Sequence, residues 1–307
     1  MSGLECVANV SEGRQPNVIA RLRASIECIP GVSLLHVDSG YDAHRTVFTF
    51  VGAEDAMVAA VVSLGKACAE LIDMRGHSGN HPRIGALDVC PLIALSPEAE
   101  LAADRAVNRI ATGLASIGLG GWFYAQSAKL EHYQDLAEVR RGEYEGLPAR
   151  AMSFDFGSHD ARFGAVALGK RPFLLAYNIN VHSREVGLVR EVARRIRQKN
   201  PHGLPGVKAI GWDCPAFSCS QVSCNIVDLN QCSPKQLFDR VQEEVHSLGS
   251  SLMGSELIGL APLYAFRDFE HVEAAINYLG LDSVESFNIS ERILDYRIPS
   301  VSTSPHL

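Results

Sequence analysis

The sequence predicts an α+β protein made of two similar lobes, and three observations lead to this prediction. The chain has 307 residues, which is more than one hydrophobic core usually fills, so two domains are expected. Apolar segments follow the order β-α-β-β-α-β in the first half, and the same order recurs from residue 173. Short similar sequences at matching places in the two halves support a duplication, since NVS (9–11) is matched by NINVHS (178–183). We therefore expect domains over 1–170 and 171–307.

Residue patterning defines the elements of the first copy. Strands are predicted where apolar and β-branched residues lie between Gly, Pro or Asp, namely LECVANV (4–10), VSLLHVDSG (32–40), HRTVFTFVG (44–52) and ALDVCPLIAL (86–95). Helical periodicity marks PNVIARLRASIECI (16–29) and EDAMVAAVVSLGKACAELI (54–72). This order suits a split β-α-β unit, an antiparallel sheet with two helices on one face.

Residues 97–117 then predict a helix and GWFYAQ (121–126) a strand. The polar stretch 129–150 includes a short helix and is a candidate link between the lobes. The second copy comprises PFLLAYNINV (172–181), SREVGLVREVARRIRQK (183–199), GVKAIGWD (206–213), SCSQVSCNIVDL (218–229), PKQLFDRVQEEVHSL (234–248) and ELIGLAPL (256–263). A cleft between two such lobes is the default place for a site.

Composition excludes several classes of protein. Hydrophobic residues make up 47% and charged residues 21%, which is typical of a globular protein. The net charge of −7 and the scattered basic residues argue against nucleic-acid binding. No apolar run is long enough to span a membrane and no signal peptide is evident, so a cytoplasmic protein is expected. The eight cysteines lie mostly in apolar runs, which predicts buried thiols and no disulfides.

The segment RGHSGNHPRIG (75–85) carries the strongest chemical signal. Its simplest interpretation is a glycine-rich turn with polar side chains. His77 and His81 are spaced like metal ligands, but Gly79 and Pro82 disfavour the helix that such a pair needs. General acid–base catalysis requires only one histidine with a pKa near 7.

His81 is the better candidate for that role because Pro82 restricts the backbone around it. Arg75, Arg83 and Arg45 could then hold an acidic substrate.

Three other segments suggest weaker hypotheses. GEYEG (142–146) places two glutamates together but is interpreted as a solvated turn. Cysteines 214, 219 and 224 could suggest a metal cluster, yet core packing is favoured because their spacing sends neighbours to opposite faces of strands. The glycine-rich stretch DFGSHDARFGAVALGK (155–170) could bring its backbone close to a flat ligand, or could be a plain connector.

Several collinear segments together resemble the glutamate formimidoyltransferase family. They are ECVANVSEG (5–13), HRTVFTFVG (44–52), LIDMRGHSGNHPRIGALDVCP (71–91), GEYEGLP, FLLAYNIN, AIGW, GSELIGLAPL and ERILDY. The resemblance spans nearly the whole chain, which makes it far more specific than any single motif. At Ser78 and Asn80 this chain differs from the residues that are usual in the family.

The resemblance implies two ferredoxin-like β-α-β-β-α-β lobes, a homodimer, and transfer of a formimino group from N-formimino-L-glutamate to tetrahydrofolate, which is a co-substrate, without a metal. His81 matches the family's acid–base histidine. Arg45 and Arg83 would clamp substrate carboxylates, and Asp38 or Glu12 would bind the amidinium, although either could be a turn or cap acid. The loop implied to cradle the folate comprises Gly157, Ser158, His159, Asp160, Ala161, Arg162, Phe163 and Gly164.

Three rival functions remain open at this stage. The enzyme could transfer a formyl group between formyltetrahydrofolate and glutamate. The chain could be a non-catalytic folate-binding module, or a metalloenzyme that uses His77 and His81.

Overall fold

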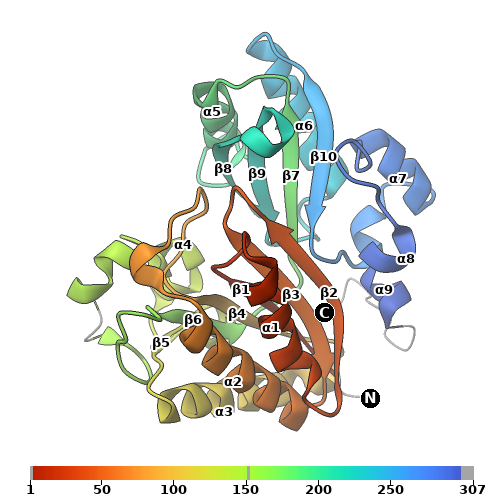
Figure 1. Cartoon of the computed structure of the whole chain (residues 1–307). Helices are drawn as coiled ribbons and strands as arrows, with labels where there is room; N and C mark the ends of the chain where they lie inside the picture. Colours follow the sequence, from red (N-terminus) through yellow and green to blue (C-terminus); the bar gives the residue numbers. More distant parts are fainter. Residues whose placement is uncertain (1–2, 151–152, 299–307) are drawn as a thin grey trace. The chain divides into compact units, whose positions relative to one another are not determined.

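A computed structural model describes residues 3–150 and 153–298, which form two compact units, Met1–Arg171 and Pro172–Leu307 (Figure 1). Each unit combines one sheet with several helices. The predicted α+β class is confirmed at this level.

Unit 1 contains a six-stranded sheet with the order β2-β3-β1-β4-β6-β5. Its strands are β1 (Leu4–Val10), β2 (Val32–Gly40), β3 (Arg45–Gly52), β4 (Leu87–Ala94), β5 (Gly121–Phe123) and β6 (Val166–Lys170). The first four pair antiparallel, and β6 adds parallel to both β4 and β5. Strand β6 lies inside the glycine-rich stretch 155–170, where no strand was predicted. The residues from Ala165 to Leu168 are fully buried, and Ala167 and Leu168 pair with both β4 and β5.

Three helices pack into the main hydrophobic core of unit 1 (Figure 1): α1 (Pro16–Glu27), α2 (Glu54–Leu71) and α3 (Glu100–Ser116). In α1 the buried residues Val18, Leu22 and Ile26 follow each other at helical spacing, so one face enters the core. Helices α2 and α3 approach closely at Gly65, where an added Cβ would lie 2.5 Å from the Leu114 side chain. A larger residue at this position would therefore force the two helices apart.

The polar stretch after β5 does not serve as a link. It contains the expected short helix, α4 (Leu136–Val139), and its apolar side chains pack within unit 1. Tyr133, Val139 and Leu147 cluster with Trp122 of β5, which is fully buried and donates from Nε1 to the carbonyl oxygen of Ser153 over 2.9 Å. These side chains join residues of β4, β5 and β6 in a second cluster, separate from the main core. Burial of aromatic area explains why a polar sequence stays attached to this sheet.

Unit 2 contains a four-stranded antiparallel sheet with the order β10-β7-β9-β8. Its strands are β7 (Leu175–Val181), β8 (Val207–Cys214), β9 (Cys219–Ile226) and β10 (Leu252–Ile258). Helices α5 (Val186–Ile196) and α6 (Pro234–Ser247) belong to the repeated β-α-β-β-α-β order, and α7 (Val272–Leu279), α8 (Ile289–Arg292) and α9 (Leu294–Arg297) follow it. Within each unit the fourth strand of this order lies beside the first, and the third lies between the first and second.

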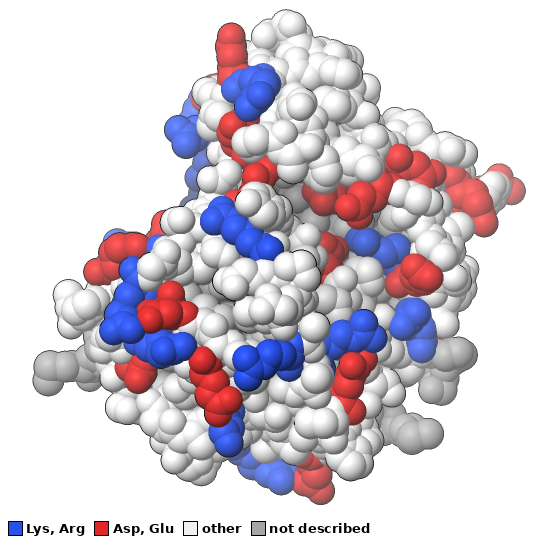
Figure 2. Space-filling view, viewed as in Figure 1, with Lys and Arg blue, Asp and Glu red and all other residues white. Residues whose placement is uncertain are grey.

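The cysteines and the surface charge agree with a globular domain pair. All eight cysteines are free thiols and seven of them are buried, as the apolar runs predicted. On the face drawn in Figure 2, acidic and basic side chains are interspersed. No helix in the described part of the chain is both long and apolar enough to cross a membrane.

Candidate active site

The loop of residues 77–86, called here the histidine loop, is tied to two other parts of unit 1. The Ser11 hydroxyl donates to the Gly85 carbonyl oxygen over 2.7 Å, and the Ala86 N–H donates to the Phe163 carbonyl oxygen over 2.8 Å. A Cβ on Gly85 would lie 2.1 Å from the Ala165 carbonyl oxygen, so only glycine allows this approach. The histidine loop and the predicted folate loop are therefore neighbours in the fold.

The turn between β2 and β3 holds the other end of the histidine loop. His44, whose φ is +50°, places Nδ1 2.8 Å from the Ser78 carbonyl oxygen, and the Asn80 N–H donates to the Asp42 carbonyl oxygen over 3.1 Å. The rings of His44 and His77 stack with centroids 4.1 Å apart. Such a positive φ is unfavourable outside glycine and persists only where surrounding contacts enforce it.

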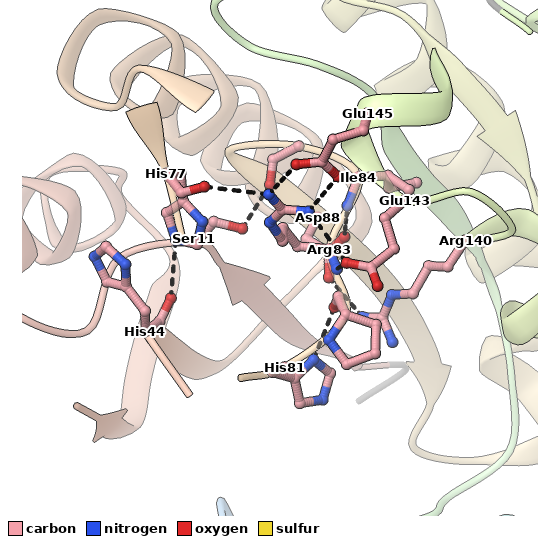
Figure 3. A network of polar contacts seen from close by, with 12 residues as sticks. Ser11, His44, His77, His81, Arg83, Ile84, Asp88, Arg140, Glu143 and Glu145 are labelled. Atoms are coloured by element: carbon pink, nitrogen blue, oxygen red, sulfur yellow. Dashed lines mark hydrogen bonds and ion pairs between the residues drawn. The ribbon is translucent and has the colours of Figure 1, made fainter. Parts of the chain in front are cut away.

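His81 lies in the part of the histidine loop between these two anchors (Figure 3). Its Nδ1 is 2.8 Å from the Pro82 carbonyl oxygen, which can only accept. This contact favours the tautomer with the proton on Nδ1, and Nε2 then carries a lone pair. Burial, followed by the charges of Arg45 and Arg140, holds the pKa of His81 well below its usual value. The imidazole is thus neutral at pH 7, and its lowered pKa makes it a weaker base than the histidine with a pKa near 7 that was expected.

A buried ionic cluster formed by Asp88, Arg45 and Arg140 lies beneath this loop. The Asp88 Oδ2 atom accepts from Nη2 of Arg45 and from Nη2 of Arg140, both at 2.5 Å, while Oδ1 accepts from the Ile84 N–H at 2.7 Å. Burial alone would raise the Asp88 pKa, but the two guanidinium groups outweigh it and lower the pKa to about 2. The carboxylate is therefore ionised and fixes the backbone that follows His81.

Arg45 donates to several of the protein's own groups. Besides Asp88, it donates to Asn9 Oδ1 at 3.0 Å and to the Pro82 carbonyl oxygen at 2.9 Å. Burial is the main reason that its pKa falls to about 10, which still leaves the group charged at pH 7. Its position indicates a residue that orders the histidine loop, in contrast to the substrate clamp expected from the sequence.

Arg83 is held by the two glutamates of GEYEG. Its Nη2 donates to Glu145 Oε1 at 2.6 Å and to the His77 carbonyl oxygen at 3.1 Å, while Nη1 contacts Glu143 Oε2 at 3.1 Å (Figure 3). GEYEG is exposed, as expected of a solvated turn, since the side chains of Glu143 and Glu145 are 43% and 65% exposed. Its carboxylates also pair with a buried arginine that lies 60 residues or more away in sequence, which the sequence did not predict.

Arg140 is a site residue that sequence reasoning missed. It contacts Asp88 through Nη2, and its buried Nε has no hydrogen-bond partner among the described residues. Its charge also lowers the His81 pKa, which shows that the two side chains are near each other. The only signal in the sequence was the pair RR at 140–141 in a polar stretch. The sequence could not show that Arg140 contacts Asp88, which lies 52 residues away.

The predicted folate loop is ordered by its own polar groups. Asp160 accepts from the Phe163 N–H through Oδ1 at 2.8 Å and from the Gly164 N–H through its carbonyl oxygen at 2.7 Å. Phe163 is fully buried in the core, and Arg162 donates to the carbonyl oxygens of Ala69 and Glu70 at the end of α2. The remaining side chains of the loop, Ser158, His159, Asp160 and Ala161, are at least partly exposed.

The two carboxylates considered for the amidinium differ in their surroundings. Glu12 Oε1 accepts from the backbone N–H groups of Arg14 and Gln15 at 2.7 and 3.0 Å and lies 3.3 Å from His44 Nε2. Glu12 therefore closes the turn before α1, whose N-cap residue, Gln15, makes no side-chain cap hydrogen bond. Asp38 lies on β2, with Oδ2 3.7 Å from His36 Nε2.

The two histidines of the predicted metal pair make different contacts. His77 places Nε2 3.2 Å from the His44 carbonyl oxygen, and His81 places Nδ1 next to that of Pro82. Residues 3–150 and 153–298 contain no group of three or more His, Cys, Asp or Glu side chains arranged to hold a metal ion.

Two family models match the chain. The model of the formiminotransferase domain, N-terminal subdomain, matches residues 3–171, and that of the formiminotransferase domain matches residues 176–270. Both matches agree with the resemblance identified from the motifs.

Similar proteins carry names that are consistent with these models. Glutamate formimidoyltransferase of Streptococcus pyogenes serotype M1 is 33% identical over 95% of this chain and 97% of its own length. The protein of the same name from Thermoplasma acidophilum is 31% identical over 96% and 98% of the two chains. Formimidoyltransferase-cyclodeaminase of Rattus norvegicus is 35% identical, but this chain spans 60% of its length. The chain therefore belongs to the formiminotransferase family.

Proposed function

We propose that the protein is a glutamate formimidoyltransferase, which transfers the formimino group of N-formimino-L-glutamate to N5 of tetrahydrofolate. The main support is the match to bacterial and archaeal proteins of that name over 97% and 98% of their lengths. The half-buried, neutral imidazole beside the ionic cluster is the group in unit 1 that suits the chemistry.

His81 moves the proton in this reaction. The folate N5 amine attacks the amidine carbon and forms a C–N bond, and Nε2 of the neutral imidazole accepts the proton that the amine loses. The bond between that carbon and the glutamate nitrogen then breaks, and the imidazolium returns the proton to the departing amine. A single histidine can act as base and then as acid in this way.

The neighbouring groups have separate roles. Arg45 and Asp88 position the histidine loop, since both hold its backbone through hydrogen bonds. Arg140 is the cation best suited to a substrate carboxylate because its Nε lacks a partner among the described residues. Arg83 could also bind a substrate carboxylate, but only if it released the glutamates that it now holds. Asp38 is a better amidinium ligand than Glu12, whose carboxylate already accepts from two backbone N–H groups.

Several further features of the protein are part of the same proposal. The folate loop from Gly157 to Gly164 would contact tetrahydrofolate, and the reaction needs no metal. The two units, with a boundary near residue 170, would be ferredoxin-like products of one duplication, which their common strand order supports. The protein would be a cytoplasmic homodimer that binds neither membrane nor nucleic acid.

Turnover of purified protein with formiminoglutamate and tetrahydrofolate tests the function. We expect His81→Ala to lower kcat about 10²- to 10⁴-fold while tetrahydrofolate still binds, because the proton carrier alone is removed. His202→Ala, in an exposed turn of unit 2, is the control and should keep wild-type turnover.

The rivals give different results in the same assay. Formylglutamate as the better donor would indicate a formyltransferase, and saturable folate binding without turnover of either donor would indicate a binding module. Loss of activity after exhaustive chelation would indicate a metalloenzyme. Full activity of His81→Ala would contradict the proposed mechanism.

A further inference from the structure

Two cysteines of unit 2 face each other at the closed end of a hairpin. Strands β8 and β9 run side by side (Figure 1), and the last residue of β8, Cys214, lies opposite the first residue of β9, Cys219. Only the turn of residues 215–218 separates them in sequence. Both are free thiols in this structure, and the proposed acid–base chemistry of unit 1 uses neither of them.

The strand register gives this pair the spacing of a disulfide. Directly opposite residues of an antiparallel pair have Cα atoms about 4.5–5.5 Å apart, and the Cα atoms of a disulfide are usually about 4.4–6.8 Å apart. An S–S bond between Cys214 and Cys219 therefore needs no movement of the backbone. The two side chains also point toward each other, since the Cys214 thiol makes a hydrogen bond to the Cys219 sulfur.

A second pair of close thiols, in unit 1, provides the comparison. Cys6 Sγ and Cys90 Sγ are 3.6 Å apart. Cys6, however, lies opposite Leu92, so Cys90 is displaced by two positions along β4 and is the diagonal neighbour of Cys6. Diagonal neighbours on one face of a sheet are about 7–8 Å apart, which exceeds the usual spacing in a disulfide. A bond between these two sulfurs would therefore require the strands to shift.

The surroundings of the two pairs have opposite effects on thiolate formation. The hydrogen bond from the Cys214 thiol is the main cause that lowers the pKa of Cys219 below its usual value. In unit 1, burial is the main cause that raises the pKa of Cys6 well above its usual value. Because the thiolate is the nucleophile in thiol oxidation, the hairpin pair contains the more reactive sulfur.

The hairpin pair also lies closer to solvent. Cys214 is 6% exposed and Cys219 is 0% exposed, but most of the turn of residues 215–218 that joins them is exposed. Cys6 and Cys90 are both 0% exposed and belong to the main core of unit 1. Local opening of one turn admits a molecule as small as hydrogen peroxide to the hairpin pair, whereas access to the other pair requires the core to open.

We propose that Cys214 and Cys219 form a peroxide-sensitive dithiol site that closes to a cross-strand disulfide. The Cys219 thiolate attacks one oxygen of hydrogen peroxide, so an S–O bond forms and the O–O bond breaks, which gives a sulfenic acid and, after protonation, one water. Cys214 then loses its proton and attacks the Cys219 sulfur, so the S–S bond forms, the S–O bond breaks and a second water leaves. Two thiols are oxidised and one peroxide is reduced. A dithiol reductant reverses the reaction by thiol–disulfide exchange.

Oxidation of the full chain with hydrogen peroxide at pH 7, followed by differential alkylation, tests this inference. Thiols that remain free are blocked with light iodoacetamide in denaturant, and thiols released afterwards by dithiothreitol are labelled with the heavy form. We expect heavy label in equal amounts at Cys214 and Cys219, formed about 10-fold or more faster than at Cys6 and Cys90. Cys224, a buried thiol of β9 with no cysteine opposite, should stay light.

Single variants separate the roles of the two cysteines. In Cys214→Ser the serine hydroxyl can still donate to Cys219, but no thiol is present to form the disulfide. The sulfenic acid at Cys219 should then persist, and dimedone should trap it in this variant and not in wild type. Cys219→Ser should leave Cys214 light. Cys224→Ser is the matched control and should form the disulfide at the wild-type rate. Thermal unfolding of each reduced variant confirms that the proteins compared are folded.

Three results would overturn the inference. The first is light label at Cys214 and Cys219 after a dose of peroxide that oxidises Cys28, the exposed cysteine. The second is heavy label at Cys6 and Cys90 as fast as at the hairpin pair, and the third is oxidation of Cys219 in wild type without that of Cys214. None of these measurements involves formimino transfer, so the inference and the proposed function can fail separately.

Discussion

Two groups of polar side chains lie in the interior and differ in charge. The ionic cluster of unit 1 consists of Asp88, Arg45 and Arg140. The amide network of unit 2 consists of Asn178, Asn180, Trp212, Gln221 and Glu256. In unit 1, Asp88 is fully buried and both of its oxygens accept hydrogen bonds, two of them from arginines. In unit 2, the network consists mostly of neutral amides, and Asn180 leaves one donor without a partner among the described residues.

The difference in charge affects how each group tolerates the loss of a member. A buried carboxylate with two guanidinium partners is rigid, because loss of the carboxylate would leave two cations close together in the interior. It is suited to hold His81 in place. A neutral network tolerates a missing partner at a smaller energetic cost than a charged one does.

Replacement of Asp88 by Asn would test the ionic cluster and should have the largest effect. Arg45 and Arg140 would then lie in the interior without their carboxylate, which we expect to destabilise the fold by about 3–5 kcal/mol. Turnover should fall as well, since the histidine loop loses the anchor at Ile84. Urea unfolding monitored by fluorescence measures the stability.

Asp104→Asn provides the control for this change, because Asp104 pairs with Lys170 and its side chain is 46% exposed. Its loss should alter stability by less than about 1 kcal/mol. An effect of similar size in the two variants would show that the buried cluster contributes no more than a surface ion pair.

Acid should weaken unit 1 in two separate pH ranges. The pKa of His77 is lowered to about 4, chiefly by burial, so the unfolded chain binds the extra proton and stability declines as pH falls from about 6.5 to 4. The pKa of Asp88 is about 2 in the folded state, below the usual 3.8, so its contribution is present above pH 4 and is lost as pH falls toward 2. That second loss is on the order of 2 kcal/mol.

Unfolding free energies measured between pH 7 and pH 2 would show both declines. His77→Gln should remove the decline between pH 6.5 and 4 attributed to His77 while leaving the lower one. The same pH dependence in the wild type and in His77→Gln between pH 6.5 and 4 would rule out this assignment for His77.

Trp212→Phe would probe the amide network with a smaller expected effect. It removes the indole donor to Gln221 and keeps an aromatic ring, so a loss of about 1 kcal/mol is expected for one neutral hydrogen bond. The amide of Gln221 would then be free to rotate. Urea unfolding measures the effect. A cost as large as that of Asp88→Asn would contradict the contrast between the two regions.

Local sequence patterns predicted most of the fold but less of the site. Runs of apolar and β-branched residues located most strands of both units, and the spacing of Val18, Leu22 and Ile26 located α1. The last strand was predicted over 256–263, but β10 spans Leu252–Ile258. Strand β6 was missed because its five residues follow a glycine-rich loop, and too few positions remain to show an alternation. The motif around His81 was recognised because its residues are contiguous.

Side-chain partners far apart in sequence could not be predicted. Arg140 reaches Asp88 across 52 positions, and Glu145 reaches Arg83 across 62, so no local pattern contains either pair. Arg45 was correctly placed near the site but was expected to hold substrate, because the sequence cannot show that Asp88 and Asn9 already use its donors. The unpaired donor of Asn180 depends on contacts among three strands and is visible only in the structure.

Glu145→Gln should have the smallest effect on stability. It tests whether an ion pair with an exposed carboxylate contributes less to stability than the buried ionic cluster does. The Glu145 side chain is 65% exposed, so the loss of its charge should change stability by less than about 1 kcal/mol even though Arg83 itself is buried. Glu143 and the His77 carbonyl oxygen still hold the guanidinium in this variant. If Arg83 instead binds a substrate carboxylate during turnover, Glu145→Gln should lower KM for formiminoglutamate, because a competing carboxylate is removed. An unchanged KM would leave Arg140 as the better candidate for that contact.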